Sequence, residues 1–384
     1  MRAGTTQPLT NAQRPRARVV FIETTDTSVA SHLDGMLAHL NMQFDISVIA
    51  SDSGRLAAIA TRNGVRGIVV PIKRQPSVIE DVRSLLRLIG MLRQEKPDIV
   101  LYGTPKAALL GCIAAWLCGV TRRVHVLHGL RAETLAGVPR LLYRQLDRLI
   151  ERLSTDTVAV GHGLAARAVQ IGSMRHKATV LGNGSAQGVD LSRFSARSPI
   201  DRDASKFVIG FVGRITADKG IDSLCRAFTI VARAVPHAEL HIIGAPEGVL
   251  TLSVETREML ETDTAIKQFG EIEDVTSPMR SFDVLCLPTR REGLPTVLME
   301  AAATGVPIVT TSATGVKDIV DESMAWIVPI DDSCALASVI LRVHSNPHQA
   351  MLMARVARRH IENRFDRRIV WGHWAEYIRR ELEA

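Results

Sequence analysis

Short apolar segments alternate with helical segments along almost the whole of this 384-residue chain, and this rhythm restricts the possible folds more than any other feature. Segments such as 207–212 and 284–288 are continuously apolar, which is typical of strands buried on both faces of a parallel sheet. Amphipathic helical patterns, such as 29–40, separate the strand candidates, which include 178–181. Strand and helix in alternation predict βαβ units and an α/β fold with doubly wound parallel sheets.

A polar stretch near the middle of the chain interrupts this rhythm. It lacks a hydrophobic period, so we expect it to link two Rossmann-like domains. The polar N-terminus has no apolar core of a signal peptide and is expected to be a flexible leader. The predicted parts are a leader at 1–17, an N-terminal domain at 18–190, a linker at 191–205, a C-terminal domain at 206–366, and a closing helix at 367–384 that crosses back to the N-terminal domain.

Composition argues against several classes of protein. The five cysteines form no C-x-x-C pair, which disfavours a disulfide framework or a structural zinc site. The longest nearly apolar run, 107–120, is shorter than the roughly 20 residues that a membrane-spanning helix needs. Residues 1–190 carry 24 basic and 14 acidic side chains, a net charge of +10, whereas residues 191–384 carry a net charge of −3. The first half is therefore expected to meet an anionic partner, unless its basic surface is simply solvated.

One candidate site follows the apolar strand at 284–288. The segment 290–300 combines a loop that contains Glu292 with a helix that opens near Pro295 and carries Glu300. The free N–H groups and positive dipole end of such a helix favour a phosphate, and carboxylates accept strong hydrogen bonds from sugar hydroxyls. An ordinary loop and helix with two surface glutamates remains the alternative.

A second candidate site follows the strand at 207–212. Gly213 ends this strand, and Arg214 and Lys219 lie in the loop that leads to the next helix. In α/β sheets ligands bind at the carboxyl ends of strands, where two cations can neutralise a diphosphate and stabilise it as a leaving group. The alternative is two solvated loop cations.

Together, the GR-x4-KG and E-x7-E motifs resemble glycosyltransferase family 4, the retaining GT-B enzymes. The segments HGLR at 128–131 and LGNGSAQGVD at 181–190 are similar to the family as well. The chain looks most like the bacterial branch that builds exopolysaccharide, capsule or lipopolysaccharide O-antigen. This resemblance implies the GT-B fold, in which two Rossmann-like doubly wound domains face each other across a cleft.

The resemblance also implies roles for individual residues. Glu300 would bind the ribose hydroxyls and Glu292 the sugar hydroxyls of a nucleotide-diphosphate sugar, most often a UDP-sugar. Arg214 and Lys219 would hold the diphosphate, and His128 would reach the donor sugar. The further donor-side positions are Gly213, Gly293, Leu294, Pro295 and Thr296, and the acceptor-side positions are Thr25, Asp26, Arg131 and Asn183. The expected transfer of a hexose retains anomeric configuration and uses neither a metal nor a cofactor.

This sequence departs from the family pattern mainly on the acceptor side. The loop after the first strand, 23–28, lacks the usual pair of glycines. Four arginines recur every four residues on one predicted helix and are candidates for contact with an anionic membrane, although they could equally form a solvated face. These membrane-facing candidates are Arg140, Arg144, Arg148 and Arg152.

We therefore predict a cytoplasmic glycosyltransferase, peripheral on the inner face of the membrane, that acts on a polyprenyl-diphosphate-linked saccharide. One alternative is a transferase that acts on a soluble natural-product acceptor, and another is a GT-B-fold protein that binds without catalysing. A nicotinamide dehydrogenase is disfavoured because no G-x-G-x-x-G follows a strand. A nucleic-acid binder is disfavoured because aromatic residues make up only 4% of the chain and no recognition motif occurs.

Overall fold

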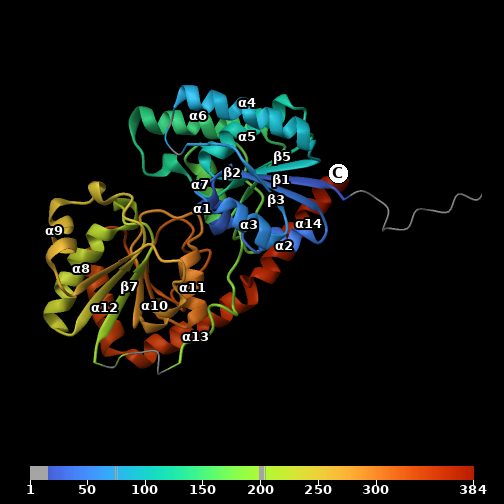
Figure 1. Ribbon diagram of the computed structural model, residues 1–384. Helices are drawn as coiled ribbons and strands as arrows, with labels where there is room; N and C mark the ends of the chain where they lie inside the picture. The colour runs from blue at the N-terminus through green and yellow to red at the C-terminus, as the bar shows by residue number, and fades with distance from the viewer. Residues whose placement is uncertain (1–15, 74, 76, 199–202, 204) are drawn as a thin grey trace, which may run out of the picture. The chain divides into compact units, whose positions relative to one another are not determined.

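The computed structural model describes residues 16–73, 75, 77–198, 203 and 205–384 (Figure 1). Most of the predicted leader and part of the predicted linker lie outside the described residues. No helix within these described ranges is both long enough and apolar enough to cross a bilayer.

The first half of the chain forms a parallel sheet in the order β3-β2-β1-β4-β5-β6. Neighbouring strands pair in parallel from β3 to β5. The central residues of β1, β2 and β4 are buried and mostly apolar, as the continuous apolar runs predict, whereas the edge strand β3 is largely exposed. The strands are β1 (Arg18–Thr25), β2 (Asp45–Ser51), β3 (Arg66–Val69), β4 (Ile99–Tyr102), β5 (Arg122–Leu127) and β6 (Asp156–Ala159).

The second half forms another parallel sheet, in the order β12-β11-β10-β7-β8-β9. In each sheet the first strand of the chain segment lies in the middle, so the winding direction reverses beside β1 and beside β7. The carboxyl ends of strands at such a reversal form the usual ligand site of α/β sheets. The strands are β7 (Phe207–Val212), β8 (Ala238–Ile243), β9 (Ile266–Gly270), β10 (Val284–Leu287), β11 (Ile308–Thr311) and β12 (Trp326–Val328).

Helices connect the strands of both sheets and cover them. In the first half these are α1 (Asp26–His32), α2 (Met36–Asn41), α3 (Leu56–Asn63), α4 (Val78–Glu95), α5 (Pro105–Leu117), α6 (Gly137–Leu153) and α7 (His162–Gln170), with a 3-10 turn η2 (Arg131–Glu133). In the second half they are α8 (Ile221–Ala234), α9 (Val254–Thr262), α10 (Thr276–Ser281), α11 (Thr296–Thr304), α12 (Ser333–Ser345), α13 (Pro347–Arg364) and α14 (Arg367–Glu383), with the 3-10 turns η4 (Ala217–Lys219) and η5 (Val249–Thr251).

Two local predictions are wrong. The helix predicted over 29–40 is divided into α1 and α2 because Gly35 adopts a left-handed φ of 77° between them. The strand predicted at 178–181 is reduced to a single bridge between Thr179 and Val158.

The described chain divides into two compact units. The first unit comprises residues up to Val126 together with Ile150–Asp156 and Ala375–Ala384, and the second comprises Leu127–Leu149 and Thr157–Trp374. Within the first unit, the hydroxyl of Tyr377 on α14 donates a hydrogen bond to Asp156 at 2.8 Å. The domain boundaries inferred from the sequence stay predictions, since these units are defined by compactness and not by the two sheets.

Candidate active site

The loop that follows β10 leads directly into α11. Pro295 precedes the helix in an extended conformation and provides no side-chain cap. Helix α11 begins at Thr296, one residue after the proline near which the sequence predicts it to open. The N–H groups of the first turn of a helix have no partner within the helix. Together with the helix dipole, they make this end of α11 a suitable place for an anion.

The predicted Lys219 and Glu292 form an ion pair. The ammonium group of Lys219 lies 2.5 Å from Oε1 of Glu292, and the two side chains are only 18% and 12% exposed. Lys219 ends the turn η4, and Gly220 follows it with a left-handed φ of 74°. A Cβ atom at Gly220 would lie 1.9 Å from the carbonyl oxygen of Pro288, so only glycine lets the two loops approach this closely.

A second ion pair ties the same two loops together. The guanidinium group of Arg291 donates to Oδ2 of Asp218 at 2.5 and 3.1 Å. The backbone carbonyl of Asp218 also accepts hydrogen bonds from the N–H of Arg290 at 2.9 Å and the hydroxyl of Thr289 at 3.2 Å. Asp218 and Arg291 were not predicted as site residues, although their opposite charges follow two strands, β7 and β10, that pair directly.

Arg214 lies at the edge of this cluster. Its side chain is 56% exposed and its guanidinium group is 3.7 Å from the carboxylate of Glu247. An exposed pair at this distance is weak, so Arg214 is free to exchange Glu247 for another anion. Gly213 closes the adjacent strand end, where its N–H donates to the carbonyl of Ile243 at 2.9 Å.

Glu300 lies on the second turn of α11 and is half-buried. Burial raises the pKa of its carboxyl group to about 7, and the charge of Arg193 lowers it only in part. Arg193 itself pairs with Asp274 at 3.0 Å. A carboxyl group with this pKa changes its charge near neutral pH, and it is suited to exchanging hydrogen bonds with ligand hydroxyls.

Backbone contacts bring His128 beside the loop after β10. His128 follows β5, and its carbonyl oxygen lies 1.8 Å from the point that a Cβ atom of Gly293 would occupy. In the same way, a Cβ atom at Gly315 would lie 2.2 Å from the carbonyl oxygen of Gly293. His128, Leu294 and Gly293 therefore lie in one part of the second unit with the Lys219–Glu292 pair.

Two of the predicted acceptor-side residues stabilise the loop after β1. Thr25 is the N-cap of α1 and accepts a hydrogen bond from the N–H of Ser28. The carboxylate of Asp26 is buried and accepts hydrogen bonds from the N–H of Thr27 at 2.8 Å, from the N–H and hydroxyl of Ser53, and from the N–H of Arg55. Although burial acts to raise the pKa of Asp26, these hydrogen bonds outweigh it and lower the pKa.

The other two acceptor-side residues lie in the second unit. The guanidinium group of Arg131 lies over the ring of Tyr143 and donates to its hydroxyl at 3.3 Å. Asn183 lies in a tight loop between Gly182 and Gly184, both with left-handed φ angles. The roles inferred for all four acceptor-side residues stay predictions.

The arginines of α6 are half-buried or exposed, and their contact with a membrane stays a prediction. Arg144 and Arg148 donate through Nε to the carbonyl of Gly172, at 3.4 and 3.0 Å, and Nε of Arg140 is buried. Arg152 is exposed. Helix α6 also exposes large apolar side chains, namely Val138, Leu141, Leu142 and Leu149.

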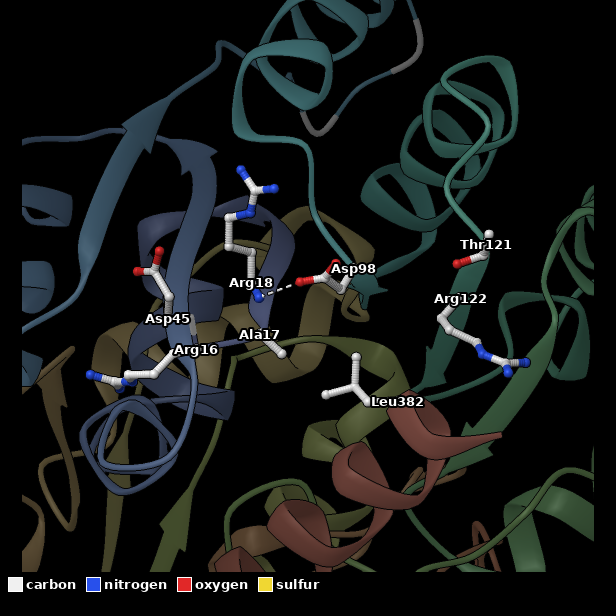
Figure 2. Close-up of a pocket in the computed structure, with 8 residues that line it drawn as sticks. All are labelled: Arg16, Ala17, Arg18, Asp45, Asp98, Thr121, Arg122 and Leu382. Carbon is white, nitrogen blue, oxygen red and sulfur yellow. Dashed lines mark hydrogen bonds between the residues drawn. The ribbon is translucent and has the colours of Figure 1, made fainter. Parts of the chain in front are cut away.

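A cavity of about 1000 Å³ in the first unit lies away from all predicted site residues. It is found where β1, β2 and β5 begin, at the edge of the sheet opposite to the carboxyl ends (Figure 2). The guanidinium groups of Arg18 and Arg122 point away from each other in this cavity, so they do not converge on one ligand. Its lining residues are Arg16, Ala17, Arg18, Asp45, Asp98, Thr121, Arg122 and Leu382.

Comparisons with known proteins agree with this geometry. Residues 28–184 match the family model described as Glycosyl transferase 4-like domain, and residues 206–346 match the model described as Glycosyl transferases group 1. The capsular polysaccharide biosynthesis glycosyltransferase CapM of Staphylococcus aureus is 30% identical over 335 residues, which cover 85% of this chain and 87% of CapM.

Two further similarities extend over most of the chain. An Escherichia coli relative, named UDP-Gal:alpha-D-GlcNAc-diphosphoundecaprenol alpha-1,3-galactosyltransferase, is 27% identical over 85% of this chain and 86% of its own length. The structure of Anabaena HepE in complex with UDP-glucose superposes with a TM-score of 0.78 at 18% identity, and covers 94% of this chain and 99% of HepE.

The chain therefore belongs to the glycosyltransferases of family 4, and its two doubly wound sheets are those of the GT-B fold. This confirms the family and the fold class that the sequence motifs predict.

Proposed function

We propose that this protein is a retaining, metal-independent hexosyltransferase that moves a sugar from a UDP-sugar to a polyprenyl-diphosphate-linked saccharide in the assembly of a bacterial surface polysaccharide. The observation that carries the proposal is the Lys219–Glu292 pair beside the open N-terminus of α11. The names of the relatives support the rest of it: one is a capsule glycosyltransferase, and another acts on a diphosphoundecaprenol-linked sugar.

The charges of the site explain how the donor would react. Negative charge grows on the diphosphate as the glycosidic bond breaks, and the Lys219 ammonium, the Arg214 guanidinium and the N–H groups of α11 can stabilise it. Glu292 would then accept hydrogen bonds from the hydroxyls of the sugar, in place of its pair with Lys219. The leaving phosphate oxygen would take the proton of the acceptor hydroxyl on the same face of the sugar, so the mechanism needs no protein base.

Glu300 would hold the ribose of the nucleotide. Its carboxylate form accepts two hydroxyl hydrogen bonds, whereas the protonated form loses part of this capacity. Because the pKa of Glu300 is raised to about 7, the carboxylate is formed only as the pH rises through that value. We therefore expect the affinity for the donor to increase between about pH 6 and pH 8.

A thermal-shift screen of nucleotide-diphosphate sugars tests the donor assignment, because a ligand that binds the folded state raises the melting temperature. We expect one UDP-sugar to stabilise the protein, more strongly at pH 8 than at pH 6. Glu300→Gln should remove both the shift and its pH dependence, whereas Glu322→Gln at an exposed position should not change either. Absence of a shift with every nucleotide sugar would contradict the proposal and favour a protein that binds another ligand.

A transfer assay tests the acceptor. The protein is incubated with the radiolabelled donor that the screen selects and with a polyprenyl-diphosphate-linked saccharide, and label is counted in the organic and aqueous phases. Label in the lipid phase supports the proposal. Label on added soluble aglycones alone would replace the lipid-linked acceptor with a soluble one while leaving the donor assignment intact.

A further inference from the structure

Helix α4 exposes a row of large apolar side chains. Val78, Ile79, Val82 and Leu86 are 82%, 67%, 50% and 63% exposed, and their spacing of three or four residues places them along one side of the helix. The opposite side of α4 buries Ser84, Leu88 and Leu92 against the first unit. Single exposed apolar residues are ordinary, but a contiguous row of this kind marks an interaction surface.

The charges that accompany this row are positive. Arg83, Arg87 and Arg93 of α4 are exposed. The three acidic residues of the helix are all engaged in ion pairs: Glu80 with Arg83 at 2.9 Å, Asp81 with Lys106 at 2.7 Å, and Glu95 with Arg66 at 2.9 Å. The exposed side of α4 therefore combines apolar side chains with a cationic margin.

The end of α5 adds an exposed tryptophan to the same region. Helices α4 and α5 pack side by side in the first unit (Figure 1). The thiol of Cys118, just after α5, contacts the carbonyl of Ile89 on α4 at 3.6 Å. Trp116 and Leu117 immediately precede this contact and are 53% and 49% exposed. Tryptophan is enriched where a protein meets the boundary between lipid and water.

We propose that the α4 face, defined as Val78, Ile79, Val82, Leu86, Trp116 and Leu117 with the flanking Arg83 and Arg87, rests on a membrane that contains anionic lipid. An amphipathic helix of this composition binds by inserting its apolar side below the headgroups while its cations attract anionic lipid. The net charge of +10 on residues 1–190 favours an anionic surface over a neutral one. The inference rests on the proposed function, because a lipid-linked acceptor must be collected at a membrane.

This assignment differs from the one that the arginine spacing of α6 predicts. Arg144 and Arg148 are engaged with Gly172, whereas Arg87 is exposed beside the apolar row of α4 and Arg83 is paired only with the neighbouring Glu80. Helices α4 and α6 both expose large apolar side chains with an arginine beside them, and the exposed Trp116 next to α4 distinguishes the α4 face.

Vesicle co-sedimentation of the full chain tests the proposal. We expect binding to vesicles of phosphatidylglycerol and phosphatidylethanolamine but little binding to phosphatidylcholine alone. Val82→Glu/Leu86→Glu should weaken binding by about tenfold or more, because it places charge in the inserted side. The matched control is Leu352→Glu/Val356→Glu on α13, where two side chains of similar exposure, 47% and 46%, have the same spacing. The control should bind like the wild type.

Tryptophan fluorescence gives an independent measurement. Vesicles should shift the emission of the wild type to shorter wavelength, and Trp116→Phe should remove most of this shift, because Trp326 and Trp374 are buried and Trp371 is half-buried beside Arg367. Melting temperatures of all variants establish that they are folded. Val82→Ser/Leu86→Ser provides a milder change should the glutamates prevent folding.

Several results would overturn the proposal. These are unchanged vesicle binding in the α4 variant, equal loss in the α13 control, or loss only when Leu141 and Leu142 of α6 are changed. A wild-type dimer that the α4 variant dissociates would instead make this face a contact between copies of the chain. The donor shift is measured on the same samples. If the donor binds and vesicles do not, the membrane inference fails while the transferase proposal stands.

Discussion

Two loops that follow the first strand of each sheet use their charged residues in opposite ways. After β1, the carboxylate of Asp26 is buried and accepts hydrogen bonds from Thr27, Ser53 and Arg55. After β7, Lys219 pairs with a carboxylate of the neighbouring loop, and both side chains keep some exposure. The first arrangement stabilises a loop, whereas the second is able to exchange partners with a ligand.

The comparison teaches that position at the carboxyl end of a strand does not by itself define a binding residue. Both loops satisfy the positional rule for α/β sheets. They differ in whether the charge is fully satisfied by backbone donors, as for Asp26, or is balanced by one opposite charge, as for Lys219. A ligand diphosphate can take the place of Glu292 on the Lys219 cation, whereas the carboxylate of Asp26 repels a diphosphate and already accepts hydrogen bonds from protein donors.

The largest expected effect is on Lys219. Lys219→Ala should lower kcat for sugar transfer by about a hundredfold, because it removes a cation from the leaving group in the transition state. Lys219→Arg should recover part of the rate, and Lys267→Ala, at an exposed position on β9, should have no effect. Initial-rate kinetics with saturating donor provide the measurement. An unchanged kcat in Lys219→Ala would remove the distinction between the two loops.

The second-largest expected effect is on the free energy of unfolding, to which Asp26 contributes. Asp26→Asn should lower the free energy of unfolding by about 2 kcal/mol, because buried N–H groups lose a charged acceptor. Asp52→Asn in the neighbouring loop, where an exposed carboxylate accepts from Gly54 and Leu56, should cost less. Urea denaturation measures both. Donor binding should persist in Asp26→Asn, and its loss would mean that this loop contacts the donor as well.

The same carboxyl group predicts a pH dependence. Since the folded-state pKa of Asp26 is below the ordinary value of 3.8, its stabilising contribution is fully present above that value and is lost as the pH falls through the folded pKa. The difference in stability between wild type and Asp26→Asn should therefore shrink in acid.

The smallest expected effect concerns the ion pair that supports Lys219. Arg291→Ala should lower kcat/KM by about fivefold, because the turn that carries Lys219 loses the ion pair of Asp218 with the loop of Glu292 and keeps only its backbone hydrogen bonds to that loop beside the Lys219–Glu292 pair. Arg290→Ala is the matched control. This substitution breaks the neighbouring ion pair between Arg290 and Asp331, whose atoms are 2.8 Å apart. The side chains of this pair do not hold the turn that carries Lys219. Equal effects from the two substitutions would make Arg291 a general stabiliser of the loop.

Periodicity predicts the fold well because buried parallel strands are apolar throughout. The residues of β7 and β10 could be read from 207–212 and 284–288 alone, and the alternation with helices indicated both doubly wound sheets. The break between α1 and α2 was not predicted, because a glycine within a helical pattern does not reveal its φ angle. Helix α13 was not predicted either, although Pro347 stands at its start.

The candidate site could be predicted residue by residue but not as a network. Motif spacing indicated Lys219 and Glu292 separately, whereas their pairing depends on β7 and β10 being neighbours in the sheet. For the same reason, the sequence did not indicate Asp218 and Arg291 as residues of the site. Charge spacing on α6 likewise could not indicate that two of its arginines donate hydrogen bonds to a distant carbonyl, that of Gly172.

The close main-chain contacts of His128 with Gly293 and of Gly293 with Gly315 restrict how this enzyme can change during evolution. A side chain at Gly293 would collide with the carbonyl oxygen of His128, and one at Gly315 would collide with the carbonyl oxygen of Gly293. Neither position can therefore vary without moving the main chain. On the proposed function, new sugar preferences must therefore arise at surrounding positions with room for variation, such as the exposed rim around Glu247. Libraries that aim to alter donor choice should leave the two glycines constant and randomise that rim.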